Sequence, residues 1–229
     1  MDNHAMEKLP DRKNSVAAFL EATKKHPIAA NTPARLVFAL DATASREHTW
    51  DLATSLHGEL FQAARSRKLS VQLVYYRGFN EFHASDWSNS SSELLNRMQR
   101  VRCIAGGTQI VRVLSHVRKE AADSELRAAV FVGDACEENP HELHELAGQL
   151  GLFRVPVFVL QEGDDMFAGH VFSRIAQRSG GAHIPFRPGS AQELAELLGA
   201  IAAYATDGID AIKKIKGQFA TRLLTQIKP

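Results

Sequence analysis

The chain has 229 residues, 45% hydrophobic and 23% charged, with a formal net charge of +1. This composition is that of a globular protein, which excludes global disorder, and a nearly neutral chain gives no reason to expect nucleic acid or an anionic membrane as the main partner. Its two cysteines, Cys103 and Cys136, form no Cys-x-x-Cys pair, so they indicate neither a disulfide framework nor a four-sulfur zinc site.

Residues 1–33 read as a helical extension ahead of the first strand. The first ten residues lack the apolar core of a secretory signal, and no later segment approaches the length of a membrane span. We therefore expect a soluble, cytoplasmic protein. A helix is expected near Asp11–Lys25, before the breaker-rich stretch His26–Pro33.

The stretch Arg35–Ser45 is an apolar run that ends abruptly in polar residues. Leu36–Leu40 is too short for a membrane span and fits a strand covered on both faces of a parallel sheet. Asp41 then lies at the carboxyl end of that strand, which is the edge where open parallel sheets bind ligands. Asp41, Thr43 and Ser45 alternate along the chain, so three oxygen-bearing side chains can surround one hard cation.

A helix, two strands and a second helix are predicted next. Thr49–Lys68 carries apolar residues at helical spacing. Ser70–Gly78 is rich in β-branched and aromatic residues, which predicts a second strand. Phe79–Ser85 follows after so short a break that we expect a hairpin and an antiparallel third strand. Ser92 is expected to cap a helix over Glu93–Arg102.

Two further oxygen ligands follow. In the motif Gly106-Gly107-Thr108, the glycines form a tight turn that brings the threonine to a place that a bulkier turn would block. A helix is expected over residues 110–122. The apolar strand 128–133 then ends in Asp134, as the first strand ends in Asp41.

Helices and strands alternate through the rest of the chain. This alternation predicts a doubly wound, mostly parallel six-stranded α/β sheet of the Rossmann-like kind, with one antiparallel edge strand and helices on both faces, over residues 34–205. Pro185 favours an edge position for the last strand. The expected elements are a helix over 140–150, a strand over 155–160, a helix over 166–178, a short strand over 181–186 and a helix over 191–204.

The tail, residues 206–229, is predicted to be one amphipathic helix. Its other face is basic, which is usually a solvated surface; a docking helix for a partner is the less favoured reading. The apolar face consists of Ile209, Ile212, Ile215, Phe219, Leu223 and Ile227, and the basic face of Lys213, Lys214, Lys216 and Arg222.

Taken together, these segments resemble the von Willebrand factor type A (VWA) domains that carry a metal-ion-dependent adhesion site (MIDAS). The family pattern is Asp-x-Ser-x-Ser after the first strand, a threonine in a later loop and an aspartate after the fourth strand. This chain has Asp41-Ala-Thr43-Ala-Ser45, Gly107-Thr108 and Gly133-Asp134. The resemblance covers about residues 34–204. It departs at Thr43, where the family usually has serine; threonine keeps the hydroxyl and adds a methyl group.

The resemblance implies a site for a divalent ion, Mg²⁺ or else Mn²⁺ or Ca²⁺. Thr43, Ser45 and Thr108 would coordinate the ion directly or nearly so, and the two aspartates, Asp41 and Asp134, directly or through water. The vacant coordination position would accept a carboxylate from a partner protein. Since no bond is broken in such binding, the resemblance implies an interaction module and not an enzyme. Two alternatives stay open, a metal-dependent hydrolase or phosphatase that uses the same edge, and a metal-free scaffold.

Three other motifs are weaker. Cys136, His141 and His144 suggest a zinc site or a catalytic Cys–His pair, but the usual zinc spacings and an orienting third group are missing. Gly106-Gly107-Thr108 lacks the spacing of a phosphate-binding loop. Asp41-x-Thr43 is similar to the nucleophile loop of haloacid dehalogenase-like phosphatases, which need a second aspartate where this chain has threonine.

Overall fold

The computed structural model describes residues 33–47, 69–123, 125–186 and 191–227. They form a six-stranded sheet in the order β3-β2-β1-β4-β5-β6. Every neighbouring pair is parallel except β2 and β3, which form the antiparallel edge. The predicted doubly wound α/β fold is therefore confirmed. The strands are β1 (Ala34–Asp41), β2 (Leu69–Arg77), β3 (Glu81–Ala84), β4 (Leu126–Gly133), β5 (Val157–Glu162) and β6 (His183–Phe186).

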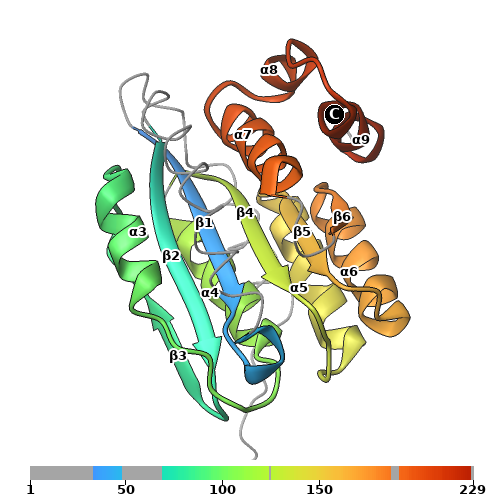
Figure 1. The fold of residues 1–229 in the computed structure, drawn as a ribbon. Helices are drawn as coiled ribbons and strands as arrows, with labels where there is room; N and C mark the ends of the chain where they lie inside the picture. Colours follow the sequence, from blue (N-terminus) through green and yellow to red (C-terminus); the bar gives the residue numbers. More distant parts are fainter. Residues whose placement is uncertain (1–32, 48–68, 124, 187–190, 228–229) are drawn as a thin grey trace, which may run out of the picture.

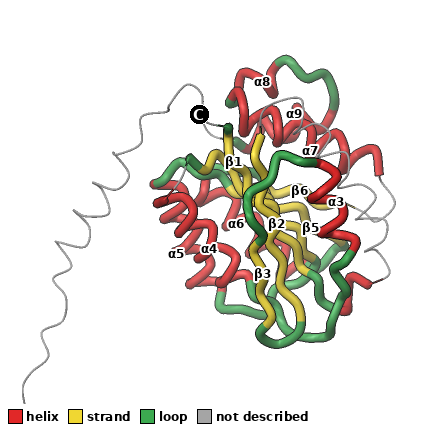
Figure 2. Tube along the Cα trace, turned by 90° about the vertical axis from the view of Figure 1, so that its left-hand side faces the viewer, coloured by secondary structure: helices red, strands yellow, loops and turns green. Residues whose placement is uncertain are grey.

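Helices cover both faces of the sheet, as Figures 1 and 2 show. The first face carries α3 (Ser91–Gln99), α7 (Ala191–Asp207), α8 (Ile209–Lys213) and α9 (Gln218–Gln226). The second face carries α4 (Ile110–Asp123), α5 (Pro140–Leu152) and α6 (Met166–Ser179). Within the described part of the chain, no helix has the length and apolar character needed to cross a membrane.

Strand β1 lies at the centre because its side chains are apolar on both faces. Leu36, Phe38 and Leu40 pack into the core under α3 and α7. Val37 and Ala39 pack into the core under α4, α5 and α6. All five are fully buried between β2 and β4. The centre of the sheet therefore holds the strand whose carboxyl end carries Asp41.

The predicted elements are found close to their expected positions. One difference is the cap of α3, because Ser90 and not Ser92 accepts the backbone N–H of Glu93. The helix then begins at Ser91 and ends at Gln99, which is earlier than expected. The helices predicted near residues 11–25 and over 49–68 lie outside the described residues.

The tail is not one helix, so that prediction is wrong. It divides into α8 and α9, and Gly217 between them has φ +151°. The bend lets both short helices reach the core that α7 covers: Ile212 and Leu223 are fully buried there. Both helices lie near the amino ends of the strands, opposite the edge that carries Asp41 (Figure 1).

Among the residues that the structure describes, one that is not glycine has a positive φ. Arg154, just after α5, has φ +58°, the left-handed region that glycine adopts most easily. We expect Arg154→Gly to raise the free energy of unfolding by about 0.5–1 kcal/mol, because relief of left-handed strain exceeds the entropy cost of glycine. Urea unfolding measures the change. Gly180, with φ +83° just after α6, is the matched control, since Gly180→Ala introduces the same strain and should destabilise. A less stable Arg154→Gly protein would mean that the arginine side chain outweighs the strain.

Candidate metal centre

Backbone contacts hold the loops at the carboxyl edge of the sheet together, at the lower end of β1 in Figure 1. The Ile104 N–H donates to the carbonyl of Ala42, which follows β1, at 3.1 Å. The Ile104 carbonyl accepts from the N–H of Gly78, in the turn after β2, also at 3.1 Å. The loop between α3 and α4 therefore lies across the ends of β1 and β2. This loop contains Thr108, the expected ligand that follows a helix and not a strand.

Asp41 is fully buried, and both of its carboxylate oxygens accept hydrogen bonds. The Thr43 N–H donates to Oδ1 at 2.8 Å, and the Tyr76 hydroxyl donates to Oδ2 at 2.7 Å. Burial raises the pKa of Asp41, and these hydrogen bonds act against the rise. Tyr76 has its pKa raised well above its usual value, by burial first and then by the charge of Asp41. The orientation of Asp41 is thus set before any ion binds.

Thr43 and Ser45 present their hydroxyls together. Their Oγ1 and Oγ atoms lie 3.1 Å apart. Two neighbouring ligands of an octahedral Mg²⁺, each about 2.1 Å from the ion, lie about 3 Å apart. Thr43 is buried and Ser45 is exposed, so the pair lies between the core and solvent. The spacing of the hydroxyls fits two positions on one such cation.

Asp134 follows β4, the strand next to β1, and supplies a second carboxylate at this edge of the sheet. The residue before it, Gly133, ends β4, and a Cβ atom on Gly133 would lie 3.7 Å from the Asp41 Cβ. Both Asp41 and Asp134 act electrostatically on Tyr76. The Asp134 Oδ1 atom is buried, and it finds no hydrogen-bond partner within the described ranges. A buried carboxylate oxygen without a partner is costly, and a cation would satisfy it.

Thr108 is tied to the loop that carries Asp134. Its Oγ1 accepts from the Glu137 N–H at 3.0 Å, and its own N–H donates to Glu137 Oε2 at 3.2 Å. The second lone pair of this hydroxyl is left for another interaction. Glu138 also joins the two loops, since its carboxylate accepts the N–H groups of Ile110 and Val111 at 2.5 and 2.8 Å. The structure thus links all three predicted segments at one edge of the sheet.

Sequence reasoning missed the residues that support the site. Arg46, 1% exposed, donates from Nε to Glu162 Oε2 at 2.8 Å and from Nη1 to the Asp41 carbonyl at 2.7 Å. These two hydrogen bonds connect the segment after β1 to the end of β5. Tyr76 is the second such residue. The only available signal was that Arg46 follows the Asp41-x-Thr43-x-Ser45 motif directly, while nothing local indicated Tyr76 or Glu162.

The zinc interpretation is not supported. Across the described ranges, no three or more His, Cys, Asp and Glu side chains are placed to hold a metal ion. Cys136 instead lies against the Glu138 carbonyl, with Sγ 3.9 Å from the oxygen, and burial raises the pKa of its thiol. The Nδ1 atom of His141 lies 3.9 Å from Oε1 of Glu145. An ion at the carboxyl edge would therefore need hydroxyl ligands as well as carboxylates.

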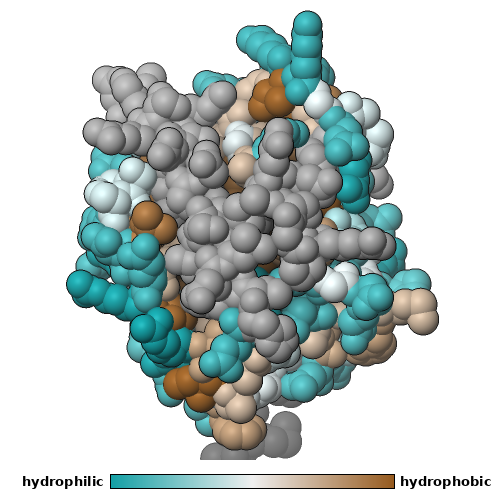
Figure 3. Space-filling model, viewed as in Figure 1, coloured by the Kyte–Doolittle hydropathy of each residue, from teal (hydrophilic) through white to brown (hydrophobic). Residues whose placement is uncertain are grey.

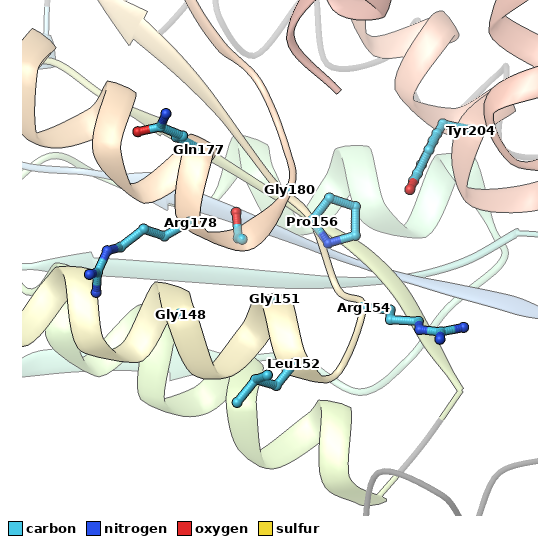
Figure 4. A pocket seen from close by; sticks show the side chains of 10 residues that line it. Gly148, Gly151, Leu152, Arg154, Pro156, Gln177, Arg178, Gly180 and Tyr204 are labelled. Atoms are coloured by element: carbon cyan, nitrogen blue, oxygen red, sulfur yellow. The ribbon is translucent and has the colours of Figure 1, made fainter. Parts of the chain in front are cut away.

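A cavity of about 660 Å³ lies at the opposite edge of the sheet, near the amino end of β5. Figure 4 shows that Arg154 and Arg178 point to opposite sides of it. Tyr204 faces it from α7. Because the two guanidinium groups diverge, they do not form one anion site. The carboxyl edge remains the candidate centre.

Solved structures share this fold. No protein-family model and no curated protein sequence matches the chain. The SpRpn10 VWA domain aligns with a TM-score of 0.57 and 12% identity, covering 71% of this chain and 93% of that one. An aerotolerance-related membrane protein from Bacteroides fragilis aligns with a TM-score of 0.58 and 14% identity, covering 73% and 98%. The pilus adhesin SpaC from Lactobacillus rhamnosus GG aligns with a TM-score of 0.58 and 10% identity, covering 78% and 30%. The chain therefore has a VWA-like fold.

Proposed function

We propose that this chain, with its VWA-like fold, is a protein-interaction module that binds a partner through a divalent cation. The ion is Mg²⁺, with Mn²⁺ or Ca²⁺ as alternatives. When bound, the cation supplies an electrophilic position for a carboxylate of the partner protein. The module breaks no bond and is not an enzyme. The residues proposed to hold the ion are Asp41, Thr43, Ser45, Thr108 and Asp134.

The unpartnered carboxylate oxygen of Asp134, at the same edge of the sheet as the buried Asp41, is the observation that carries the proposal. Without a cation, burial disfavours the charge on Asp41. A divalent ion would compensate both carboxylates at once. The remaining proposed ligands are hydroxyls, which carry no charge. They leave the ion attractive to an acidic group from outside.

The shape of the site is held by neighbouring residues. Tyr76 holds the Asp41 carboxylate, and Arg46 holds the Asp41 carbonyl. Glu137 holds Thr108 at both its N–H and its hydroxyl. Ligands held in this way lose little freedom when an ion binds, which favours affinity. The hydrogen bonds of these neighbours thus support a preorganised site.

Thermal unfolding in EDTA and in Mg²⁺ tests the proposal. A ligand that binds only the folded state stabilises it by about 2.7 kcal/mol at 100 times its Kd. For a chain of this size, that corresponds to a rise in Tm of about 5–10 °C. We expect the rise in the wild type and its loss in Asp134→Asn, which removes the charge and keeps the shape. Thr43→Val, which replaces the hydroxyl with a methyl group, should also lose it.

Asp123→Asn is the matched control. Asp123 is exposed at the far end of α4, about 20 Å along the helix from Ile110. The same charge change there should leave the metal-dependent rise intact. If the wild type shows no rise with Mg²⁺, Mn²⁺ or Ca²⁺ at millimolar concentration, the proposal is wrong. The metal-free scaffold would then be the better account.

A further inference from the structure

Exposed hydrophobic residues gather around the proposed metal centre. Across the described ranges, five large hydrophobic side chains are exposed, and four of them lie at the carboxyl edge. Three of these follow β2 or β5, and the fourth, Ile104, belongs to the loop that lies across the ends of β1 and β2. Phe79 and Met166 are each 82% exposed. Figure 3 shows hydrophobic colour at the lower margin of the visible face. Such clustering of apolar side chains marks interaction surfaces.

These four residues form two groups, one on each side of the centre. The β2 flank is Phe79, in the turn after β2, with Ile104, whose carbonyl accepts the N–H of Gly78. The β5 flank is Met166 with Phe167, at the start of α6 just after β5. The sheet order places β1 and β4, which carry Asp41 and precede Asp134, between the two flanks. The centre therefore lies between two apolar surfaces.

The sheet geometry gives the span between the flanks. From β2 to β5 there are three strand intervals, or about 14 Å. In an extended chain, residues two apart lie about 7 Å from each other and point to the same side. If one side chain of such a segment lies over the centre, the side chains two residues before it and two residues after it lie about 14 Å apart. An extended segment of five residues matches this distance.

We infer that the site takes an extended partner segment with an acidic residue at its centre and an apolar side chain two residues away on each side. The inference rests on the proposed function, since the central carboxylate completes the coordination of the ion. The apolar side chains pack on the β2 flank and the β5 flank. The flanks thus determine which acidic residues are accepted, and the ion supplies the attraction to a carboxylate.

Labelled pentapeptides test the inference, with fluorescence anisotropy in Mg²⁺ and in EDTA. The probe is Leu-Ser-Glu-Ser-Leu with blocked ends, which is too short to form a stable helix. Ser-Leu-Glu-Leu-Ser has the same composition and charge, but its leucines point away from the side of the glutamate. Leu-Ser-Gln-Ser-Leu lacks the carboxylate. We expect the probe to bind in Mg²⁺ about tenfold more tightly than either control peptide, and not in EDTA.

Variants of the protein locate the contacts. Phe79→Ser and Met166→Ser should each weaken binding of the probe severalfold. Leu152→Ser is the control, since Leu152 lies at the other edge and is 60% exposed. Methyl NMR of the methionines gives a second readout. The Met166 methyl should shift when the probe is added, whereas that of Met98, fully buried under α3, should not.

The outcomes separate this inference from the proposed function. Equal Mg²⁺-dependent binding of both glutamate peptides, unchanged in Phe79→Ser and Met166→Ser, would overturn the inference and leave the metal function in place. A metal-dependent rise in Tm without binding of the probe would do the same. The lack of any metal-dependent rise in Tm would overturn both. Binding of longer helical peptides in place of the probe would contradict the extended form of the partner.

Discussion

Replacing Arg46 with methionine is expected to lower the free energy of unfolding by about 3–5 kcal/mol, the usual effect of removing one partner from a buried ion pair. Arg46 and Glu162 are 1% and 7% exposed at their side chains, with 2.8 Å between Nε and Oε2. The variant leaves the Glu162 carboxylate buried without this cation. It also frees the Asp41 carbonyl, which accepts from Arg46 at 2.7 Å. Chemical denaturation with urea measures the loss.

A double-mutant cycle separates the pair from its surroundings. Glu162→Gln removes the charge, and Arg46→Met with Glu162→Gln should be more stable than Arg46→Met alone, because no buried charge is left unpaired. Arg77→Met is the control for a pair in contact with solvent, since the side chains of Arg77 and Glu81 are 21% and 46% exposed and the pair should contribute less than about 1 kcal/mol. If Arg46→Met lowers the free energy of unfolding by less than about 1 kcal/mol, the Arg46–Glu162 ion pair contributes little to stability.

The Gly106→Ala protein is expected to lose about 3 kcal/mol of stability and its metal response together. A Cβ at Gly106 would lie 2.0 Å from the Gly78 carbonyl oxygen. Because that atom belongs to the backbone, one of the two loops must move. The displaced loop carries Thr108, so we expect the Mg²⁺-dependent rise in Tm to fall strongly. Thermal unfolding in EDTA and Mg²⁺ gives both quantities in one experiment.

The neighbouring glycine supplies the matched control. A Cβ at Gly107 would meet only Glu137 Oε2, at 3.0 Å, and this atom ends an exposed side chain that can rotate away. The rotation breaks the bond from the Thr108 N–H to Oε2, whereas the bond from the Glu137 N–H to Thr108 Oγ1 comes from the backbone and remains. Gly107→Ala should therefore stay within about 1 kcal/mol of the wild type and keep most of its metal response. Equal losses in the two variants would mean that the tight approach of Gly106 to Gly78 does not decide the position of Thr108.

Local patterns predicted most of the fold correctly. The apolar run at Leu36–Leu40, followed by Asp41, located the central strand because burial on both faces needs apolar residues at every position. The short link before Phe79 predicted the antiparallel edge, because two strands joined so closely can only pair as a hairpin. The sequence was less informative where several neighbouring residues could fill the same role. In the serine run at residues 90–92, the sequence did not show that Ser90 is the cap.

The candidate ligands were found in the sequence because each follows a strand or a glycine turn. Their mutual arrangement was expected only from the resemblance. The structure adds the 3.1 Å separation of the Thr43 and Ser45 hydroxyls and the unpartnered Asp134 oxygen. It also corrects the role of the two glycines, since Gly106 alone makes a close backbone approach.

The sequence by itself determined the order and type of the strands and the polar residues that end them, because these depend on side-chain periodicity along a few neighbouring residues. The tertiary structure alone decided the contacts that hold the site. Tyr76 reaches Asp41 across 35 positions, and Arg46 reaches Glu162 across 116. It also decided the bend of the tail at Gly217, which lets Ile212 and Leu223 both enter the core. Such contacts depend on strand order and on packing between distant segments, which no local pattern encodes.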